Sequence, residues 1–229
     1  MTAGPTALRV TVERSDPGAR GTFEIERSAV HVVLDALAAV AQRDPSLFFR
    51  YSCRSGVCGT CTVVADGRPV LACQTPVRPD AASIHVAPLG GFPVVRDLVV
   101  DPAPFAQRWA AAGGRLSPDA GTAGDAGTPR ARRVIEDSLD CISCGACFAA
   151  CDLSAADRVF LGPAALTRAS VVIADRRDTV REERLAAVAG REGVEGCHGI
   201  GACSVVCPKA LDPARAIRRL RRWRLSGLP

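Results

Sequence analysis

The first third of the chain alternates apolar and polar side chains with the period of a β-strand. In residues 7–14, Leu8, Val10 and Val12 fall on one face, and residues 22–26 continue the same pattern. Such alternation is typical of strands with one buried face. The turn-rich stretch between the two segments therefore predicts a β-hairpin.

A helix and further strands follow this hairpin. Apolar residues recur at helical spacing in residues 30–41, which predicts an amphipathic helix. Residues 62–73 predict a second hairpin that turns at an Asp-Gly pair, and residues 83–88 predict one more strand. Hairpin, helix, hairpin and strand in this order are typical of a β-grasp ferredoxin domain, which we expect over residues 1–100.

The pattern changes after residue 100. Residues 111–130 are rich in Gly, Ala, Pro and Asp and show no periodicity, so we expect residues 101–132 to form a linker or mobile segment. Beyond it, three segments have helical spacing and no strand alternation is evident. The sequence thus predicts an α+β fold, with the N-terminal β-grasp domain followed by a C-terminal α-helical domain over residues 133–229.

Composition excludes several classes of protein. The 229 residues carry a net charge of +5 and only 4% are aromatic, which is poor for base stacking, so we expect no nucleic-acid partner. The arginine-rich C-terminal helix is interpreted as a solvated face, with a docking surface for a partner or for anionic lipid headgroups as the alternative. Without a secretory signal or an apolar run of about 18 residues, the chain is expected to stay in the cytosol.

The 11 cysteines are clustered, and in the cytosol this favours metal ligation over disulfides. The first group, spaced C-x4-C-x2-C-x11-C, consists of Cys53, Cys58, Cys61 and Cys73. This is the pattern of plant-type [2Fe–2S] proteins. Zinc ligands usually come as two separated pairs, so the closely spaced triple favours a [2Fe–2S] cluster.

Two further groups resemble the cysteine run of bacterial ferredoxins, C-x2-C-x2-C-x3-C. The second group has the full run, and the third has Ile200 in place of the second cysteine. In two-cluster ferredoxins the fourth cysteine of each run ligates the other cluster. Crossing the ligands in this way predicts a [4Fe–4S] cluster on Cys141, Cys144, Cys147 and Cys207. It also predicts a [3Fe–4S] cluster on Cys151, Cys197 and Cys203, and no cysteine is left over.

A plant-type [2Fe–2S] motif followed by such a dicluster domain resembles the iron–sulfur subunit of the succinate dehydrogenase/fumarate reductase family. The matching pieces include CRSGVCGTC, VLACQT, VVRDLVVD, LGPAAL and CHGIGACSVVCPK, and together they span nearly the whole chain. The resemblance implies an electron-transfer subunit of a succinate:quinone oxidoreductase. Electrons would pass from an FAD-containing flavoprotein subunit through the three clusters to quinone at membrane-anchor subunits, on the cytoplasmic side of the bacterial inner membrane.

The resemblance also implies residues near the quinone. The family places a His and an apolar residue there, which match His198 and Ile200, although simple packing is the alternative for His198. Many relatives with this layout have Pro directly after the cysteine that matches Cys151 and an aromatic residue a few positions later. This chain has Asp152 and Ala156 instead, a departure that is compatible with a menaquinone-type acceptor.

Other functions fit the residues less well. A related fumarate reductase subunit with a thiol or soluble donor is the main alternative, because the stretch after Cys151 departs from the family. The small subunit of a molybdenum hydroxylase would need a C-x-C motif, which the chain lacks. An iron–sulfur sensor would need fewer clusters and an output module.

Overall fold

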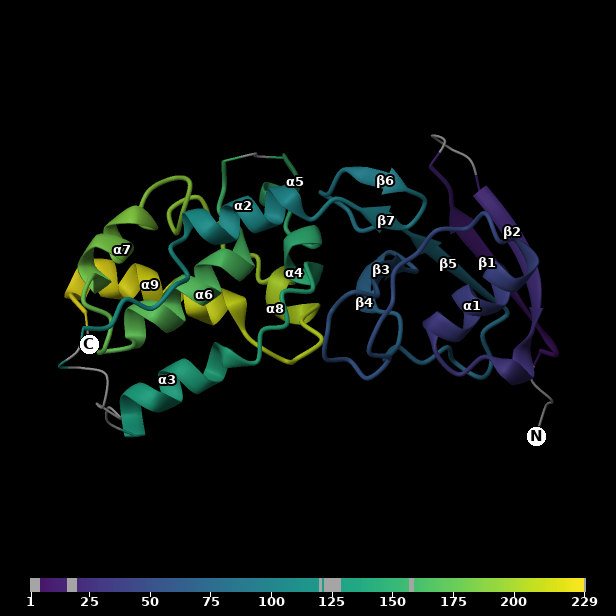
Figure 1. Cartoon of the computed structure of the whole chain (residues 1–229), viewed down its shortest axis with the longest axis horizontal. Coiled ribbons are helices and arrows are strands. Elements are labelled where there is room, and N and C mark those ends of the chain that lie inside the picture. Colours follow the sequence, from purple (N-terminus) through teal and green to yellow (C-terminus); the bar gives the residue numbers. More distant parts are fainter. Residues whose placement is uncertain (1–4, 16–19, 120, 122–128, 157–158, 229) are drawn as a thin grey trace. The chain divides into compact units, whose positions relative to one another are not determined.

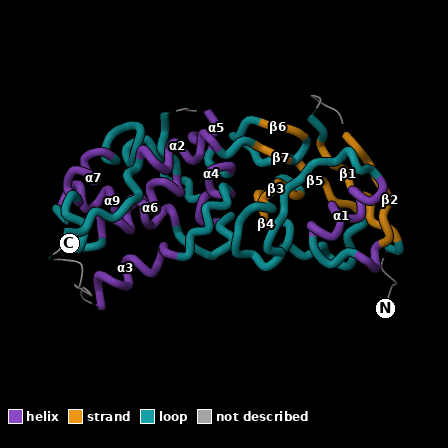
Figure 2. The backbone as a smooth tube through the Cα atoms, viewed as in Figure 1, coloured by secondary structure: helices purple, strands orange, loops and turns teal. Residues whose placement is uncertain are grey.

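A computed structural model describes most of the chain, and the described residues are 5–15, 20–119, 121, 129–156 and 159–228 (Figure 1). Backbone contacts divide the chain into two compact units. The first unit consists of Met1–Asp101 with Cys144–Ala146, and the second of Pro102–Ser143 with Cys147–Pro229. Strands dominate the first unit and helices the second, as Figure 2 shows.

The first unit is built on a mixed five-stranded sheet. Its strands are β1 (Ala7–Glu13), β2 (Arg20–Glu26), β3 (Thr62–Ala65), β4 (Arg68–Leu71) and β5 (Ser83–Ala87). Their order is β2-β1-β5-β3-β4, in which β1 and β5 pair in parallel and the other neighbours are antiparallel. The two predicted hairpins and the later strand are confirmed, because alternation and turn chemistry are local signals.

Helix α1 (Val33–Arg43) follows a short 3-10 turn, η1 (Arg27–Ala29). The Asp35 carboxylate accepts main-chain N–H groups of His31 and Val32, both at 3.0 Å, and so satisfies donors at the helix start. The first turn also donates to the chain beyond β4, from Leu34 N to Ala72 O at 2.9 Å. The helix therefore helps to fix the peptide that carries Cys73.

A second ribbon, β6 (Val94–Arg96) and β7 (Val99–Val100), was not predicted by alternation. Its turn is held by Asp97, whose buried carboxylate accepts the N–H groups of Ser15 at 3.1 Å and Phe48 at 2.9 Å. Burial alone raises the pKa of Asp97, but these donors outweigh it and leave the pKa below its ordinary value. The ribbon therefore depends on hydrogen bonds between residues that are far apart in the sequence, and not on the strand propensity of its own residues.

The second unit is helical. Its elements are α2 (Ala103–Ala111), α3 (Pro129–Leu139), α4 (Ala146–Ala149), α5 (Asp152–Ala156), α6 (Pro163–Ala174), α7 (Arg181–Ala187), α8 (Ala202–Val205) and α9 (Pro213–Ser226). Helix α6 is buried along nearly its whole length and packs against α2, α3, α7 and α9. Its Leu166 and Ile173 form the core with Phe160, Ile217 and Leu220. The predicted α+β fold class is confirmed.

The predicted linker, residues 101–132, is more structured than its composition indicates. It contains α2, and after α2 the chain is fastened to the second unit by Asp178. The buried Asp178 carboxylate accepts the N–H of Ser117 at 2.8 Å and pairs with Arg184 at 2.8 Å. Residues 122–128 lie outside the described residues, and the division at 1–100, 101–132 and 133–229 stays a prediction. In the part of the chain that the structure describes, no helix has the length and apolarity to cross a membrane.

Candidate metal centres

The first cysteine group lies on a loop whose backbone turns repeatedly into the left-handed region. Arg54, Gly56 and Gly59 have φ of 53°, 72° and 71°. The loop wraps around the Cys53 sulfur, which accepts the N–H groups of Ser55 and Cys58, both at 3.4 Å. The Ser55 N–H is the main reason that the pKa of Cys53 falls to about 5. The loop thus stabilises a thiolate, the form of cysteine that binds metal.

Cys61 and Cys73 form the buried side of this group. Ala72 N–H donates to Cys61 O at 3.1 Å, which ties the end of β4 to the loop. Burial raises the pKa of Cys61 to about 11, and the neighbouring Cys73 thiol adds to the effect. A bound cation reverses this preference for the neutral thiol. Since Cys53 and Cys58 are exposed, the group has one buried and one open side.

The cysteine loop packs closely against the side chain of Gln74 at Gly56. A Cβ at this position would lie 2.8 Å from Cγ of Gln74, the residue after Cys73. The loop and the fourth cysteine are therefore packed together, and only glycine combines this contact with a positive φ. Three free thiols on such a loop, with the free thiol of Cys73 beside it, fit a [2Fe–2S] cluster.

The second group is less completely described. Cys141 and Cys207 are far apart in the sequence but close in space: burial raises the pKa of Cys141, and the nearby Cys207 raises it further. Cys147 lies in α4, and Cys144 belongs to the residues grouped with the first unit. The structure therefore brings together at least one thiol from each of the two ferredoxin-like runs.

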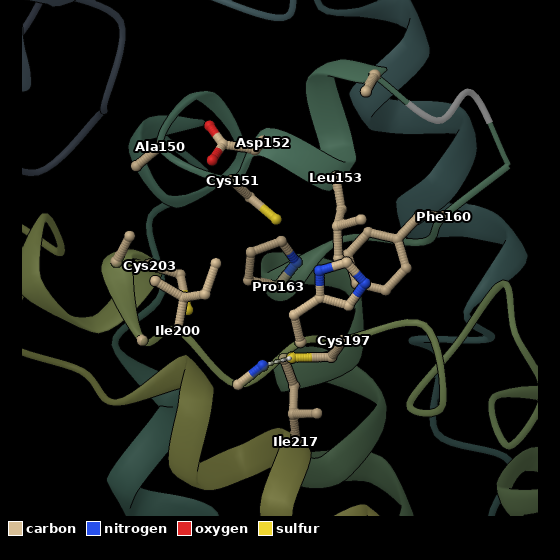
Figure 3. Close-up of a pocket in the computed structure, with 15 residues that line it drawn as sticks. Ala150, Cys151, Asp152, Leu153, Phe160, Pro163, Cys197, Ile200, Cys203 and Ile217 are labelled. Atoms are coloured by element: carbon tan, nitrogen blue, oxygen red, sulfur yellow. Dashed lines mark hydrogen bonds between the residues drawn. The ribbon is translucent and has the colours of Figure 1, made fainter.

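The third group surrounds a cavity of about 220 Å³, which we call the three-cysteine cavity. Cys151 comes from the turn before α5, Cys197 from the loop after α7, and Cys203 from α8, and Figure 3 shows their sulfur atoms around the cavity. Burial raises the pKa of Cys203 to about 11, and Cys151 and Cys197 add to the increase, as expected for thiols in close proximity. The sequence placed these cysteines in one site, and the structure brings them together.

The rest of this cavity is mainly apolar. Its described lining includes Leu153, Phe160, Pro163, Ile200 and Ile217, visible in Figure 3. Ile200 is nevertheless 76% exposed, so it lies at the open side of the cavity. His198 and Asp152 supply polar groups to the lining. Both residues that the sequence placed near an acceptor, His198 and Ile200, therefore share one cavity with three cysteines.

The spacing of thiolates differs between a single metal ion and a cluster. Thiolates around one zinc ion lie about 3.8 Å apart, given Zn–S bonds of about 2.3 Å in a tetrahedron. Among the described residues, no three side chains of His, Cys, Asp or Glu are close enough to hold a single ion. In a cluster each thiolate binds one iron, and thiolates on different irons lie further apart than those around a single ion. All 11 cysteines are free thiols, a donor set that fits iron–sulfur clusters.

Sequence reasoning missed one residue of this region, Arg221 of α9. Its guanidinium donates to the main-chain carbonyl of Cys197, the cysteine that lines the cavity. Arginines of this helix were interpreted as a solvated face. The available signal was spacing, because Arg221 lies one turn after the buried Ile217 on the same face.

Two family models match the chain. A 2Fe-2S iron-sulfur cluster binding domain matches residues 8–107, and a 4Fe-4S dicluster domain matches residues 137–211. A chain of the Mycobacterium smegmatis Sdh1 complex in the apo form has the same fold, with a TM-score of 0.84 at 24% identity over 97% of this chain and 98% of that chain. Fold and site together define a two-domain iron–sulfur protein.

Relatives identify the family. The fumarate reductase iron-sulfur subunit of Haemophilus influenzae is 34% identical over 228 residues, covering 93% of this chain and 89% of the relative. That of Escherichia coli O6:H1 is 37% identical over 203 residues, covering 86% and 82%. The succinate dehydrogenase iron-sulfur subunit of Coxiella burnetii is 36% identical over 205 residues, covering 87% of each. The chain belongs to the family of succinate dehydrogenase and fumarate reductase iron–sulfur subunits, as the sequence predicted.

Proposed function

We propose that the chain carries electrons between a flavoprotein subunit and membrane quinone in a succinate:quinone oxidoreductase. The observation that carries this proposal is the convergence of Cys151, Cys197 and Cys203 on a cavity that is also lined by Ile200, the residue that replaces a cysteine of the ferredoxin pattern. Three thiolates suit a [3Fe–4S] cluster, whereas a decayed four-iron site would leave a cysteine without a role. The other ligand sets in the proposal are Cys53, Cys58, Cys61 and Cys73 for [2Fe–2S] and Cys141, Cys144, Cys147 and Cys207 for [4Fe–4S].

Clusters bound at these sites would supply one-electron redox chemistry, and the protein residues hold and shield them. At the first site, N–H groups of Ser55 and Cys58 donate to the Cys53 sulfur, a contact of the type that tunes reduction potential. At the third site, Gly199 N–H donates to the Cys197 sulfur at 3.4 Å. Cluster type, hydrogen bonds to sulfur and exposure set the reduction potential, and we expect the higher potential at the site with three thiolates, which suits delivery to an acceptor.

The proposed acceptor site lies at the open side of the three-cysteine cavity, beside the cluster that its thiolates would hold. Apolar walls with a few polar groups are typical of sites for ring-shaped organic ligands. Leu153 and Ile217 supply apolar contacts, and His198 and Asp152 supply polar ones. We propose a quinone beside His198 and Ile200, of the menaquinone type because Asp152 and Ala156 replace the residues that the resemblance leads one to expect.

The exposed cysteine loop of the first unit supports a flavoprotein partner. Val57 lies on this loop and is 64% exposed, and Tyr51 and Phe48 are exposed near it in the sequence. The guanidinium of Arg54 lies 4.9 Å from the Tyr51 ring centroid. Exposed apolar and aromatic side chains mark surfaces that a partner protein covers. We propose that the flavoprotein docks on this loop, and that one or more anchor subunits hold the chain on the cytoplasmic side of the bacterial inner membrane.

Purification of the complex from membranes tests the proposal. The proposed function predicts a co-purifying flavoprotein and membrane-anchor polypeptides, together with succinate-dependent reduction of a menaquinone analogue. Absence of the flavoprotein contradicts the proposal. Activity only with a thiol or soluble donor would instead favour the related fumarate reductase.

A further inference from the structure

Helix α2 lies within residues 101–132, the segment whose composition predicted a linker, yet two of its side chains contact α4 and α5 (Figure 1). These are Phe105 and Arg108, which lie three positions apart and therefore on the same face of α2. The Phe105 ring packs edge-on against the Phe148 ring of α4, with 5.7 Å between the ring centroids. Helix α2 therefore contacts the chain just before Cys151.

Arg108 contacts both α4 and α5. Its guanidinium lies over the Phe148 ring, with Cζ 4.8 Å from the ring centroid, and Nη1 donates to Ser154 O at 3.1 Å. Ser154 lies in the five-residue helix α5, which is too short to satisfy its own last carbonyl groups. A planar guanidinium can stack on a ring and donate from its edge at the same time. Arg108 therefore holds α5 against α4 and α2.

The two helices that Arg108 contacts are not equally well held by other residues. Phe148 is only 1% exposed, and a Cβ on Gly162 would lie 3.3 Å from its Cδ2 atom. Cys151 N–H donates to Phe148 O at 3.2 Å, so the position of Cys151 follows that of Phe148. In α5, by contrast, three of the five residues are exposed. Loss of the Arg108 contact should therefore displace α5 more than it displaces Cys151.

Helix α5 forms one wall of the three-cysteine cavity, because Asp152, Leu153 and Ala156 line it (Figure 3). Arg108 is not among the described residues that line the cavity. We propose that Arg108 is a positioning residue for the acceptor site, one that acts through α5 and determines where this wall lies. The inference rests on the proposed function, because it concerns the acceptor proposed at this cavity.

This placement has a consequence for acceptor binding. A hydrogen bond from a charged donor shifts an equilibrium by about tenfold or more. If α5 leaves its position in part of the molecules, the apparent affinity for the acceptor falls with the fraction that remains competent. We therefore expect Arg108→Gln to raise the KM for a menaquinone analogue about threefold to tenfold, with kcat nearly unchanged.

The test is succinate-dependent reduction of a menaquinone analogue by the complex purified from membranes, with an EPR spectrum of each oxidised variant. Arg108→Gln should raise KM and keep the three-iron signal. Arg108→Lys keeps the charge and a donor for Ser154 O but not the planar group over Phe148, so KM should rise only about twofold to threefold. The control Arg115→Gln removes the same charge from an exposed position in the segment after α2 and should leave KM unchanged.

The outcomes separate a positioning role from a purely structural one, and both from the proposed function. A structural role would lower the amount of intact cluster, so that kcat and the three-iron signal fall together at an unchanged KM; this result overturns the proposal. If the unmodified complex reduces no menaquinone analogue, the proposed function fails as well. If it does, and Arg108→Gln has the KM of Arg115→Gln, only the role of Arg108 is refuted. Should Arg108→Gln not assemble, Arg108→Lys decides: a raised KM with an intact signal supports the role, and an unchanged KM or a lost signal overturns it.

Discussion

The segment after α2 is held by a buried ion pair whose loss should destabilise the second unit. The Asp178 side chain is 0% exposed and that of Arg184 is 12% exposed. Asp178→Ala leaves the guanidinium without its carboxylate and the Ser117 N–H without its acceptor. Breaking a buried pair costs about 3–5 kcal/mol. Because Arg184 keeps hydrogen bonds to Gly113 O and Ser117 Oγ, we expect the lower end, about 3 kcal/mol.

Urea unfolding followed by tryptophan fluorescence measures this loss. Both tryptophans, Trp109 and Trp223, lie in the second unit, so the signal reports that unit. With an m-value of about 2 kcal/mol/M, a loss of 3 kcal/mol lowers the midpoint by about 1.5 M. The control Glu136→Ala removes an exposed pair with Arg132 and should cost about 0.3–0.5 kcal/mol. A midpoint for Asp178→Ala equal to that of the control would refute the reasoning.

Two further predictions concern the first unit. Burial raises the pKa of Asp97, but N–H donors from Phe48 and Ser15 outweigh it, so the pKa is lowered in the folded protein. The ionised carboxylate therefore stabilises the fold fully above its ordinary pKa of about 3.9. This contribution to the free energy of unfolding is lost as pH falls through the pKa of the folded state. Circular dichroism between pH 2 and 5 should show acid unfolding that Asp97→Asn makes less dependent on pH. An equally steep profile for Asp97→Asn would contradict this. Gly56→Ala should reduce [2Fe–2S] content, measured by visible absorbance, because its Cβ would clash as well as strain a positive φ. Gly67→Ala strains a similar φ in open space, so equal losses in both variants would count against the packing argument.

Local signals explain which elements could be predicted from the sequence. The strands of the main sheet follow from alternation, and their turns follow from residues such as Asp66, whose φ of 46° suits a tight hairpin. The ribbon of β6 and β7 depends on Asp97 binding Ser15, more than 80 residues away in the chain, and no periodicity records such a contact. The segment after α2 is likewise held by a hydrogen bond to Asp178, which is distant in the sequence.

The residues of the candidate site likewise include some that sequence spacing predicts and others that depend on contacts between distant segments. Cysteine spacing predicts ligand groups because a cluster constrains the loop that wraps around it, and the pairing of Cys151 with Cys197 and Cys203 followed from the ferredoxin pattern. Spacing places Arg221 on the buried face of α9, one turn after Ile217, but it does not indicate that the guanidinium binds the Cys197 carbonyl.

EPR spectroscopy of the oxidised complex, recorded for the unmodified protein and for Ile200→Cys, tests the three-iron assignment most directly. We expect a three-iron signal and about nine irons per chain in the unmodified protein. Ile200→Cys supplies a fourth thiolate, so it should weaken or abolish that signal, raise the iron content to about ten, and lower the potential of the site. Absence of the signal from the unmodified protein, or an identical signal and iron content in Ile200→Cys, would contradict the assignment of Cys151, Cys197 and Cys203 to a three-iron cluster.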